Sequence, residues 1–161
     1  LRVSEKTNAM RILEAEGIAY RVRAYEIDED DLSAERAAAA LDMSPEQVFK
    51  TLVVQGDRSG PMLTLLPAGT EIDFKRLAKV TGDKKVELVP LREVQDLTGY
   101  VRGAVTPLAI HRSYPIYIDE TVILWPEVGI SAGAKGLEIL LAPQDLLDVT
   151  GAKAADIASS V

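Results

Sequence analysis

Hydrophobic and polar residues recur with two different periods along the chain, and the period separates expected helices from expected strands. Apolar residues three and four positions apart predict a helix over 7–16, and Gly17 is well placed to end it. Alternation over 18–27 predicts a half-exposed strand. Ser33 is a typical N-cap for the alanine-rich helix that we expect at 34–41.

The rest of the chain mixes the two element types without a strict strand–helix–strand order. A helix is expected at 74–80, with Asp73 as its N-cap and Gly82 at its end. Further helices are expected at 90–97, 143–149 and 152–158. Further strands are expected at 47–54, 62–66, 86–89, 100–105, 115–118, 121–124 and 137–141. A mixed α+β fold, with helices packed around a mixed sheet, fits this order better than a doubly wound parallel fold. The chain contains neither a linker nor a repeat, so we expect a single domain over 1–161.

Lys50 interrupts the apolar row of the strand expected at 47–54. Alternate residues of a strand share a face, which places Lys50 with Val48, Leu52 and Val54. Burying a lysine is costly unless its ammonium group meets a partner or a ligand. The side chain therefore reaches the rim of the sheet, pairs with a structural carboxylate, or faces a cavity that takes an anionic or carbonyl ligand.

The composition excludes several kinds of site. The chain has no cysteine, so a disulfide, a thiolate nucleophile and a Cys-based zinc site are all impossible. Its single histidine, His111, stands in an expected connector with no carboxylate nearby in sequence to orient it. We therefore expect no metal site and no cofactor.

The net charge of −7 argues against a broad nucleic-acid-binding surface, and we expect no DNA partner. A local basic cluster could still follow a phosphate backbone, and it comprises Lys75, Arg76, Lys79, Lys84 and Lys85. The alternative is a solvated helix face, because acidic residues interrupt this cluster. No apolar run approaches the roughly 20 residues of a membrane span. We expect a cytoplasmic protein without a signal peptide or a membrane partner.

Two stretches of small residues break local rules. Gly103 lies inside the strand expected at 100–105, where a glycine often marks a bulge or the close approach of a ligand. Residues 130–138 could direct backbone N–H groups at an anion or a carbonyl oxygen, or form an ordinary glycine-rich turn. They are not a phosphate-binding P-loop, because Lys135 precedes Gly136 instead of following it.

Five stretches, taken in order, carry a resemblance to a known family. They are Val48-Phe49-Lys50-Thr51-Leu52, 73–79, 84–87, 98–107 and 131–138. Their order and spacing resemble the YbaK/prolyl-tRNA-synthetase-associated editing domain family from Asn8 to Ile157. Free-standing YbaK-type deacylases of Cys-tRNA(Pro) are similar in length and layout. The resemblance implies a mixed, partly barrel-like β-sheet surrounded by helices, with a pocket for the aminoacyl-adenosine end of a tRNA.

The resemblance also implies roles for individual residues. Those implied for catalysis are Lys50, Gly103 and Glu138, and those for substrate binding are Tyr25, Thr51, Ser131 and Gly133. Lys50 would hold the terminal phosphate or polarise the ester, and Gly103 would let the backbone approach the aminoacyl group. Two positions depart from the family: Glu138 stands in place of an aspartate, and Ala104 in place of a second glycine.

The activity that this resemblance implies is deacylation of a mischarged aminoacyl-tRNA, by hydrolysis or by a substrate-assisted, lyase-type step. Without cysteine and with one poorly supported histidine, the chain has no ordinary nucleophile. The mechanism that the resemblance implies needs none, because the thiol of the substrate cysteine attacks its own ester. Cysteine on tRNA(Pro) is the expected substrate, and prolyl-tRNA synthetase is a possible partner. The alternatives are alanine on tRNA(Pro), another aminoacyl-tRNA, or a non-catalytic adaptor that binds tRNA or a synthetase.

Overall fold

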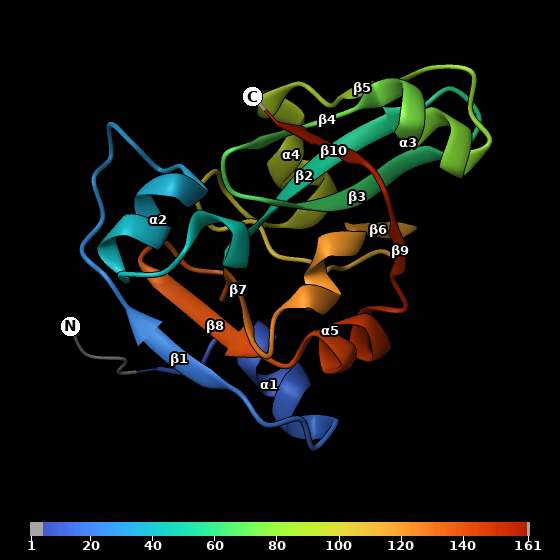
Figure 1. The fold of residues 1–161 in the computed structure, drawn as a ribbon. Coiled ribbons are helices and arrows are strands. Elements are labelled where there is room, and N and C mark those ends of the chain that lie inside the picture. Colours follow the sequence, from blue (N-terminus) through green and yellow to red (C-terminus); the bar gives the residue numbers. More distant parts are fainter. Residues whose placement is uncertain (1–4, 161) are drawn as a thin grey trace.

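Ten strands in three sheets form the centre of the protein, for which a computed structural model describes residues 5–160 (Figure 1). The strands are β1 (Arg21–Ala24), β2 (Phe49–Gly56), β3 (Gly60–Pro67), β4 (Thr70–Ile72), β5 (Val86–Leu88), β6 (Ile116–Asp119), β7 (Val128–Ser131), β8 (Leu137–Leu141), β9 (Lys153–Ala155) and β10 (Ala158–Ser160). The largest sheet has the order β5-β2-β3-β6-β9, with β6 parallel to both of its neighbours. An antiparallel sheet has the order β1-β8-β7, and β10 pairs with β4. The expected mixed sheet is therefore confirmed.

Helices surround these sheets. They are α1 (Asn8–Ala15), α2 (Ala34–Ala40), α3 (Phe74–Thr81), α4 (Leu91–Thr98) and α5 (Pro143–Thr150), together with the 3₁₀ helices η1 (Pro45–Gln47) and η2 (Glu120–Leu124). The side chains of Thr7, Ser33 and Asp73 cap α1, α2 and α3 by accepting a hydrogen bond from a backbone N–H three residues on. The N-caps expected at Ser33 and Asp73 are thus confirmed.

Each helix covers an apolar face of a sheet. In the lower half of Figure 1, α1 and α5 pack on the β1-β8-β7 sheet, where Leu13, Ile139 and Leu146 share one core. In the upper half, α3 covers the β2 face that carries Val54. On the other face of that sheet, Val94 of α4 packs with Val53. The residues of β2 therefore alternate between two cores.

The two larger sheets meet at the start of β2. Val48 forms a parallel bridge with Gly129 of β7, and Ala38 of α2 packs against Val48. The fold thus continues from one sheet to the other beneath α2, which lies between the two halves in Figure 1. This junction positions the site described below.

The chain between α4 and β6 forms turns, so the strand expected at 100–105 is wrong. Gly99 ends α4 with a φ of 83°, and Gly103 has a φ of 86°, both in the left-handed region that glycine favours. The backbone N–H of Ala104 also donates to the carbonyl of Val101 at 3.0 Å, which closes a turn. Two glycines in this conformation stop the extended backbone that the alternating sequence suggested.

Two further expectations are wrong for different reasons. Residues 121–124 belong to the 3₁₀ helix η2, because Asp119 accepts a hydrogen bond from the backbone N–H of Thr121 and turns the chain. Residues 152–158 form β9 and the start of β10 instead of a helix. Residues 152–158 are rich in alanine, which favours helices. The pairing of β9 with β6 and of β10 with β4 outweighs this preference. Strand β7 was not expected at all, since only two of its four residues, Val128 and Ile130, are large and apolar.

Within residues 5–160, none of the helices is long and apolar enough to cross a membrane.

Candidate functional site: a pocket beside β2

A cavity of about 510 Å³ lies beside β2, between α2 on one side and α4 on the other. We call it the inner pocket. Its walls include six of the seven residues expected at the catalytic and substrate-binding positions: Tyr25, Lys50, Thr51, Gly103, Ser131 and Glu138. Its volume is in the range of small-molecule sites in proteins. The fold therefore gathers residues that lie more than a hundred positions apart in the sequence.

Lys50 is half-buried in the wall of the inner pocket. Its Nζ donates a hydrogen bond to the backbone carbonyl of Thr70 at 2.5 Å. Among residues 5–160, Lys50 forms no ion pair, so a structural carboxylate does not explain its position. An ammonium group has three N–H donors. Two of them remain for a ligand, while Thr70 fixes the position of the group.

Strand β2 presents an open edge at Thr51. In an antiparallel ladder the N–H and C=O of every second residue point toward the same neighbouring strand. The carbonyl of Val53 accepts a hydrogen bond from Val89 on the side of β5, so the backbone of Thr51 points to that side as well. The ladder with β5 covers only Val54–Gly56, and Thr51 lies beyond it. The Thr51 hydroxyl is also buried, and no hydrogen-bond partner for it lies within the described part of the chain.

Glu138 is a buried carboxyl group in the inner pocket. Only 3% of the residue is exposed, and burial raises its pKa to about 8. A Cβ atom at Gly129 would lie 3.0 Å from Oε2 of Glu138, so the glycine on β7 leaves room for the carboxyl group. Oε2 has no hydrogen-bond partner among residues 5–160. At neutral pH the group is largely protonated and can donate a hydrogen bond to a ligand.

Ser131 and Tyr25 lie on either side of Glu138. Ser131 is directly opposite Glu138 in the β7–β8 ladder, so the two side chains share a face of the sheet. The Ser131 hydroxyl accepts a hydrogen bond from the backbone N–H of Gly133 at 3.2 Å. Burial raises the pKa of Tyr25, and the nearby Glu138 carboxylate adds to this shift. The tyrosine is therefore a neutral wall of the pocket.

Gly103 contributes to the inner pocket from a turn, whereas the sequence suggested a bulged strand. A Cβ atom at this position would lie 3.2 Å from Cβ of Leu32, just before α2. Gly103 is thus needed both for its positive φ and for its close contact with the segment that leads into α2.

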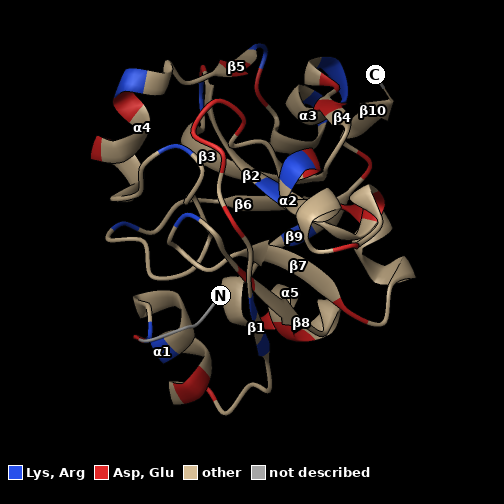
Figure 2. Ribbon diagram, turned by 90° about the vertical axis from the view of Figure 1, so that its left-hand side faces the viewer, with Lys and Arg blue, Asp and Glu red and all other residues tan. Residues whose placement is uncertain are grey.

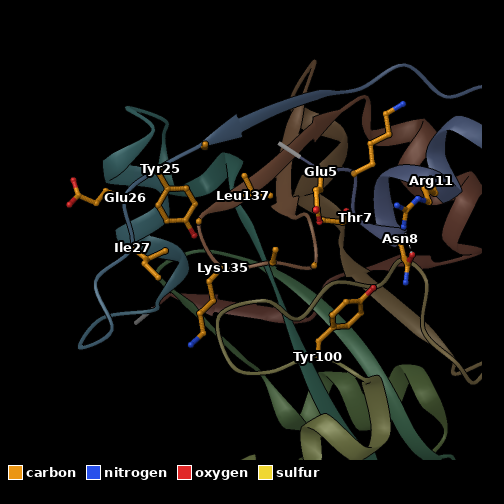
Figure 3. A pocket seen from close by; sticks show the side chains of 15 residues that line it. Glu5, Thr7, Asn8, Arg11, Tyr25, Glu26, Ile27, Tyr100, Lys135 and Leu137 are labelled. Carbon is orange, nitrogen blue, oxygen red and sulfur yellow. Dashed lines mark hydrogen bonds between the residues drawn. The ribbon is translucent and has the colours of Figure 1, made fainter. Parts of the chain in front are cut away.

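Gly133, the seventh expected residue, lies in a neighbouring depression of about 730 Å³, which we call the outer groove. Figure 3 shows Tyr25 on one side of this groove, Thr7, Asn8 and Arg11 on the other, and Tyr100 between them. Tyr25 also lines the inner pocket, so this side chain separates the two spaces.

The expected basic cluster lies on and after α3 and lines neither the inner pocket nor the outer groove. Arg76 is engaged by two acidic side chains, Asp73 at 2.9 Å and Asp156 at 2.6 Å. Lys85 faces Glu87 at 3.8 Å. Figure 2 shows basic and acidic stretches interspersed around α3 and β5 instead of one basic face. A contact between this cluster and tRNA stays a prediction.

Two pocket features were missed in the sequence. Arg102 lines the inner pocket, and its place beside Gly103 could have indicated it. Gly129 gave no signal, because its importance depends on Glu138 in the neighbouring strand. Among the residues that the structure describes, no group of three or more His, Cys, Asp or Glu side chains could hold a metal ion.

Comparison with known proteins identifies relatives along most of the chain. The profile of the aminoacyl-tRNA editing domain family matches residues 28–149. A protein of Enterococcus faecalis, provisionally named a Cys-tRNA(Pro)/Cys-tRNA(Cys) deacylase, is 37% identical over 97% of this chain and 95% of its own length. A multifunctional Ser/Thr-tRNA deacylase of Escherichia coli K12 is 27% identical over 86% of this chain and 83% of its own.

Solved structures share the fold. The crystal structure of a protein provisionally described as a trans-editing enzyme for prolyl tRNA synthetase superimposes with a TM-score of 0.82. It is 28% identical, and the match covers 98% of this chain and all of the other.

Proposed function

This chain belongs to the aminoacyl-tRNA editing domain family, and from that premise we propose that it is a trans-editing deacylase that removes cysteine from mischarged tRNA(Pro). One observation carries the proposal. The inner pocket joins Lys50 to two buried polar groups, Thr51 Oγ1 and Glu138 Oε2, that lack partners within the described chain. Buried polar groups are normally hydrogen-bonded, so such a pair supports a polar ligand.

We assign Lys50 to the substrate as a donor. With one N–H directed at Thr70, its ammonium group binds the phosphate of the terminal adenosine or polarises the ester carbonyl. Protonated Glu138 donates a hydrogen bond to the ester region, where negative charge develops during acyl transfer. The N–H of Thr51 at the open edge of β2 provides another donor.

The reaction needs no nucleophile from the protein. No histidine or cysteine is among the residues that line the inner pocket. The thiol sulfur of the substrate cysteine attacks its own ester carbonyl carbon, a C–S bond forms, and the bond from that carbon to the 3′ oxygen of the adenosine breaks. The thiol proton moves to the 3′ oxygen, so the tRNA leaves with a free hydroxyl. The pocket contributes by holding the thiol and the carbonyl in contact.

The choice of amino acid rests on the relatives and on the pocket. The Enterococcus faecalis relative is named for cysteine and the Escherichia coli relative for serine and threonine. All three amino acids carry a hydroxyl or thiol group, which can bind the unpartnered Thr51 or Glu138 side chains. We therefore expect alanine, which has no such group, to be a poor substrate, because it leaves these buried polar atoms without partners.

Deacylation assays on tRNA(Pro) charged with cysteine, alanine or proline, and on tRNA charged with serine or threonine, test this function. We expect Cys-tRNA(Pro) to be hydrolysed fastest and Pro-tRNA(Pro) to be spared. Release of alanine at the rate of cysteine contradicts the assigned selectivity. Failure to release any amino acid contradicts the proposed deacylase activity and favours an adaptor that binds tRNA.

The same assay with added prolyl-tRNA synthetase tests the proposed partner. The protein carries a net charge of −7, and it therefore has little long-range attraction for tRNA. We expect the synthetase to increase the deacylation rate by presenting the charged tRNA. An unchanged rate, together with no co-elution of the two proteins and tRNA in gel filtration, contradicts this partnership.

A further inference from the structure

The inner pocket and the outer groove lie next to each other and share lining residues. A small hollow of about 10 Å³ lies between them. Its walls include Leu32 and Gly103, which also line the inner pocket, and Lys135 and Gly136, which also line the outer groove. Tyr25 belongs to all three spaces. The two larger spaces therefore adjoin at Tyr25, and a ligand that occupies both must pass this side chain.

Within residues 5–160, the outer groove contains one cation without an ion pair, several neutral polar groups and the carboxylates of Glu5 and Glu26. Lys6 is paired with Glu14 at 2.5 Å, and Lys135 with Glu29 at 3.1 Å. Arg11 lines the groove without an ion pair to any of residues 5–160, and its Nη1 donates to Asn8 Oδ1 at 2.8 Å. An arginine guanidinium has five N–H donors in a planar fork that matches a phosphate.

Two aromatic rings face this space as well. The Tyr100 hydroxyl donates to the carbonyl of Leu108 at 2.7 Å, which fixes the ring. A Cβ atom at Gly133 would lie only 2.9 Å from the same ring, so the glycine permits its position. Tyr25 stands at one side of the groove in Figure 3, across from Arg11. Fixed aromatic rings can stack on unpaired bases with little loss of side-chain freedom.

We propose that the outer groove binds the unpaired nucleotides that precede the terminal adenosine of the tRNA substrate. In this arrangement Arg11 contacts a phosphate, and Tyr25 and Tyr100 contact bases. The inference rests on the proposed function, because the ester in the inner pocket fixes which end of the RNA enters. Single-stranded RNA ends are commonly bound in this way, by aromatic stacking and basic side chains along the backbone.

Equilibrium binding of two probes tests the groove. Adenosine 5′-monophosphate fills the inner pocket alone, whereas the trinucleotide CpCpA reaches into the outer groove. Measured by isothermal titration calorimetry, CpCpA should bind the wild-type protein roughly tenfold more tightly, which corresponds to one charge-assisted hydrogen bond. Arg11→Ala should remove most of this advantage. It should also reduce the slope of log affinity against log salt by about 0.7, the value for one phosphate contact in a single strand.

Two variants keep this experiment specific. Arg11→Lys preserves the charge and should retain part of the CpCpA advantage. Arg58→Ala removes the same charge from the exposed β2–β3 hairpin and should leave binding of both probes unchanged. The proposal is overturned if CpCpA binds no more tightly than the mononucleotide, if neither probe binds, if Arg11→Ala keeps the advantage, or if Arg58→Ala removes it.

Deacylation of Cys-tRNA(Pro) by the same preparations separates the two proposals. If the protein deacylates Cys-tRNA(Pro) but Arg11→Ala keeps the CpCpA advantage, the nucleotide-binding role of the outer groove is contradicted and the proposed function is not. A wild-type protein that binds CpCpA through Arg11 but deacylates no tRNA contradicts the proposed function alone.

Discussion

Two residues that line the inner pocket each have a buried polar atom, Thr51 Oγ1 and Glu138 Oε2, without a hydrogen-bond partner in the described chain. Leaving such groups unpaired costs about 1–3 kcal/mol each. Gly129 permits this burial of Glu138, because a Cβ atom there would lie only 3.0 Å from Oε2 of the carboxyl group. At the level of single residues, the protein thus gives up stability at the place where a polar substrate would restore the missing hydrogen bonds.

The pKa of Glu138 predicts how stability depends on pH. Its pKa is about 8 when folded and 4.5 in the unfolded chain, so the folded protein binds this proton more tightly. The resulting stabilisation is complete below about pH 4.5 and is lost as the pH rises through about 8. Its upper limit is on the order of 5 kcal/mol. Urea unfolding between pH 4.5 and 9 should show this decline for the wild type, and Glu138→Gln should lack it. Parallel curves for the two proteins contradict a buried, protonated Glu138.

Strand β2 and its hairpin show how an element positions the site. Asp83, just after α3, accepts hydrogen bonds from the backbone N–H groups of Arg58 and Ser59, both at 2.8 Å. Its other oxygen accepts from the Thr81 hydroxyl at 2.6 Å. Burial opposes ionisation of Asp83, but these hydrogen bonds outweigh it and lower its pKa to about 2. One carboxylate therefore ties the end of α3 to the turn that follows β2.

Asp83→Asn should destabilise the fold by about 2 kcal/mol at pH 7, because the amide cannot accept from Thr81 in the same way and the charge is lost. A carboxyl group with a depressed pKa contributes stability above about pH 4 and loses it as the pH falls toward 2. Urea unfolding at pH 7, 4 and 2.5 should therefore show a shrinking difference between the two proteins. Asp96→Asn, on the exposed side of α4, should have no effect at any pH. A constant difference for Asp83→Asn contradicts the role of its charge.

Local sequence signals predicted those elements whose cause is local. The caps Ser33 and Asp73 and the terminal Gly82 mark helix ends through contacts within a few residues, and all three lie where expected. Residues 152–158 could not be predicted in this way, because the partners that make them strands are β6 and β4, far away in the sequence. The alternation at 100–105 failed because positive φ at two glycines outweighed it.

At the scale of the whole molecule, the site depends on contacts between distant segments. The motif order was enough to indicate the family and six residues of the inner pocket, but not the open edge of β2 or the contact of Gly129 with Glu138. The placement of Gly133 in a second space could not be predicted either, since the boundary at Tyr25 depends on how β1 meets the loop before β8. These features depend on how neighbouring strands pair and where the pairing ends, which the sequence does not reveal.

The central claim, that Lys50 acts on an aminoacyl-tRNA in the inner pocket, is tested most directly by deacylation of Cys-tRNA(Pro) with Lys50→Ala. Circular dichroism and thermal unfolding first establish that the variant folds. Lys153→Ala, which removes an exposed lysine from β9, serves as the matched control. We predict that Lys50→Ala lowers the rate by roughly 100-fold or more, as expected for loss of a donor to developing charge, while Lys153→Ala keeps full activity. Full activity in folded Lys50→Ala would contradict the account.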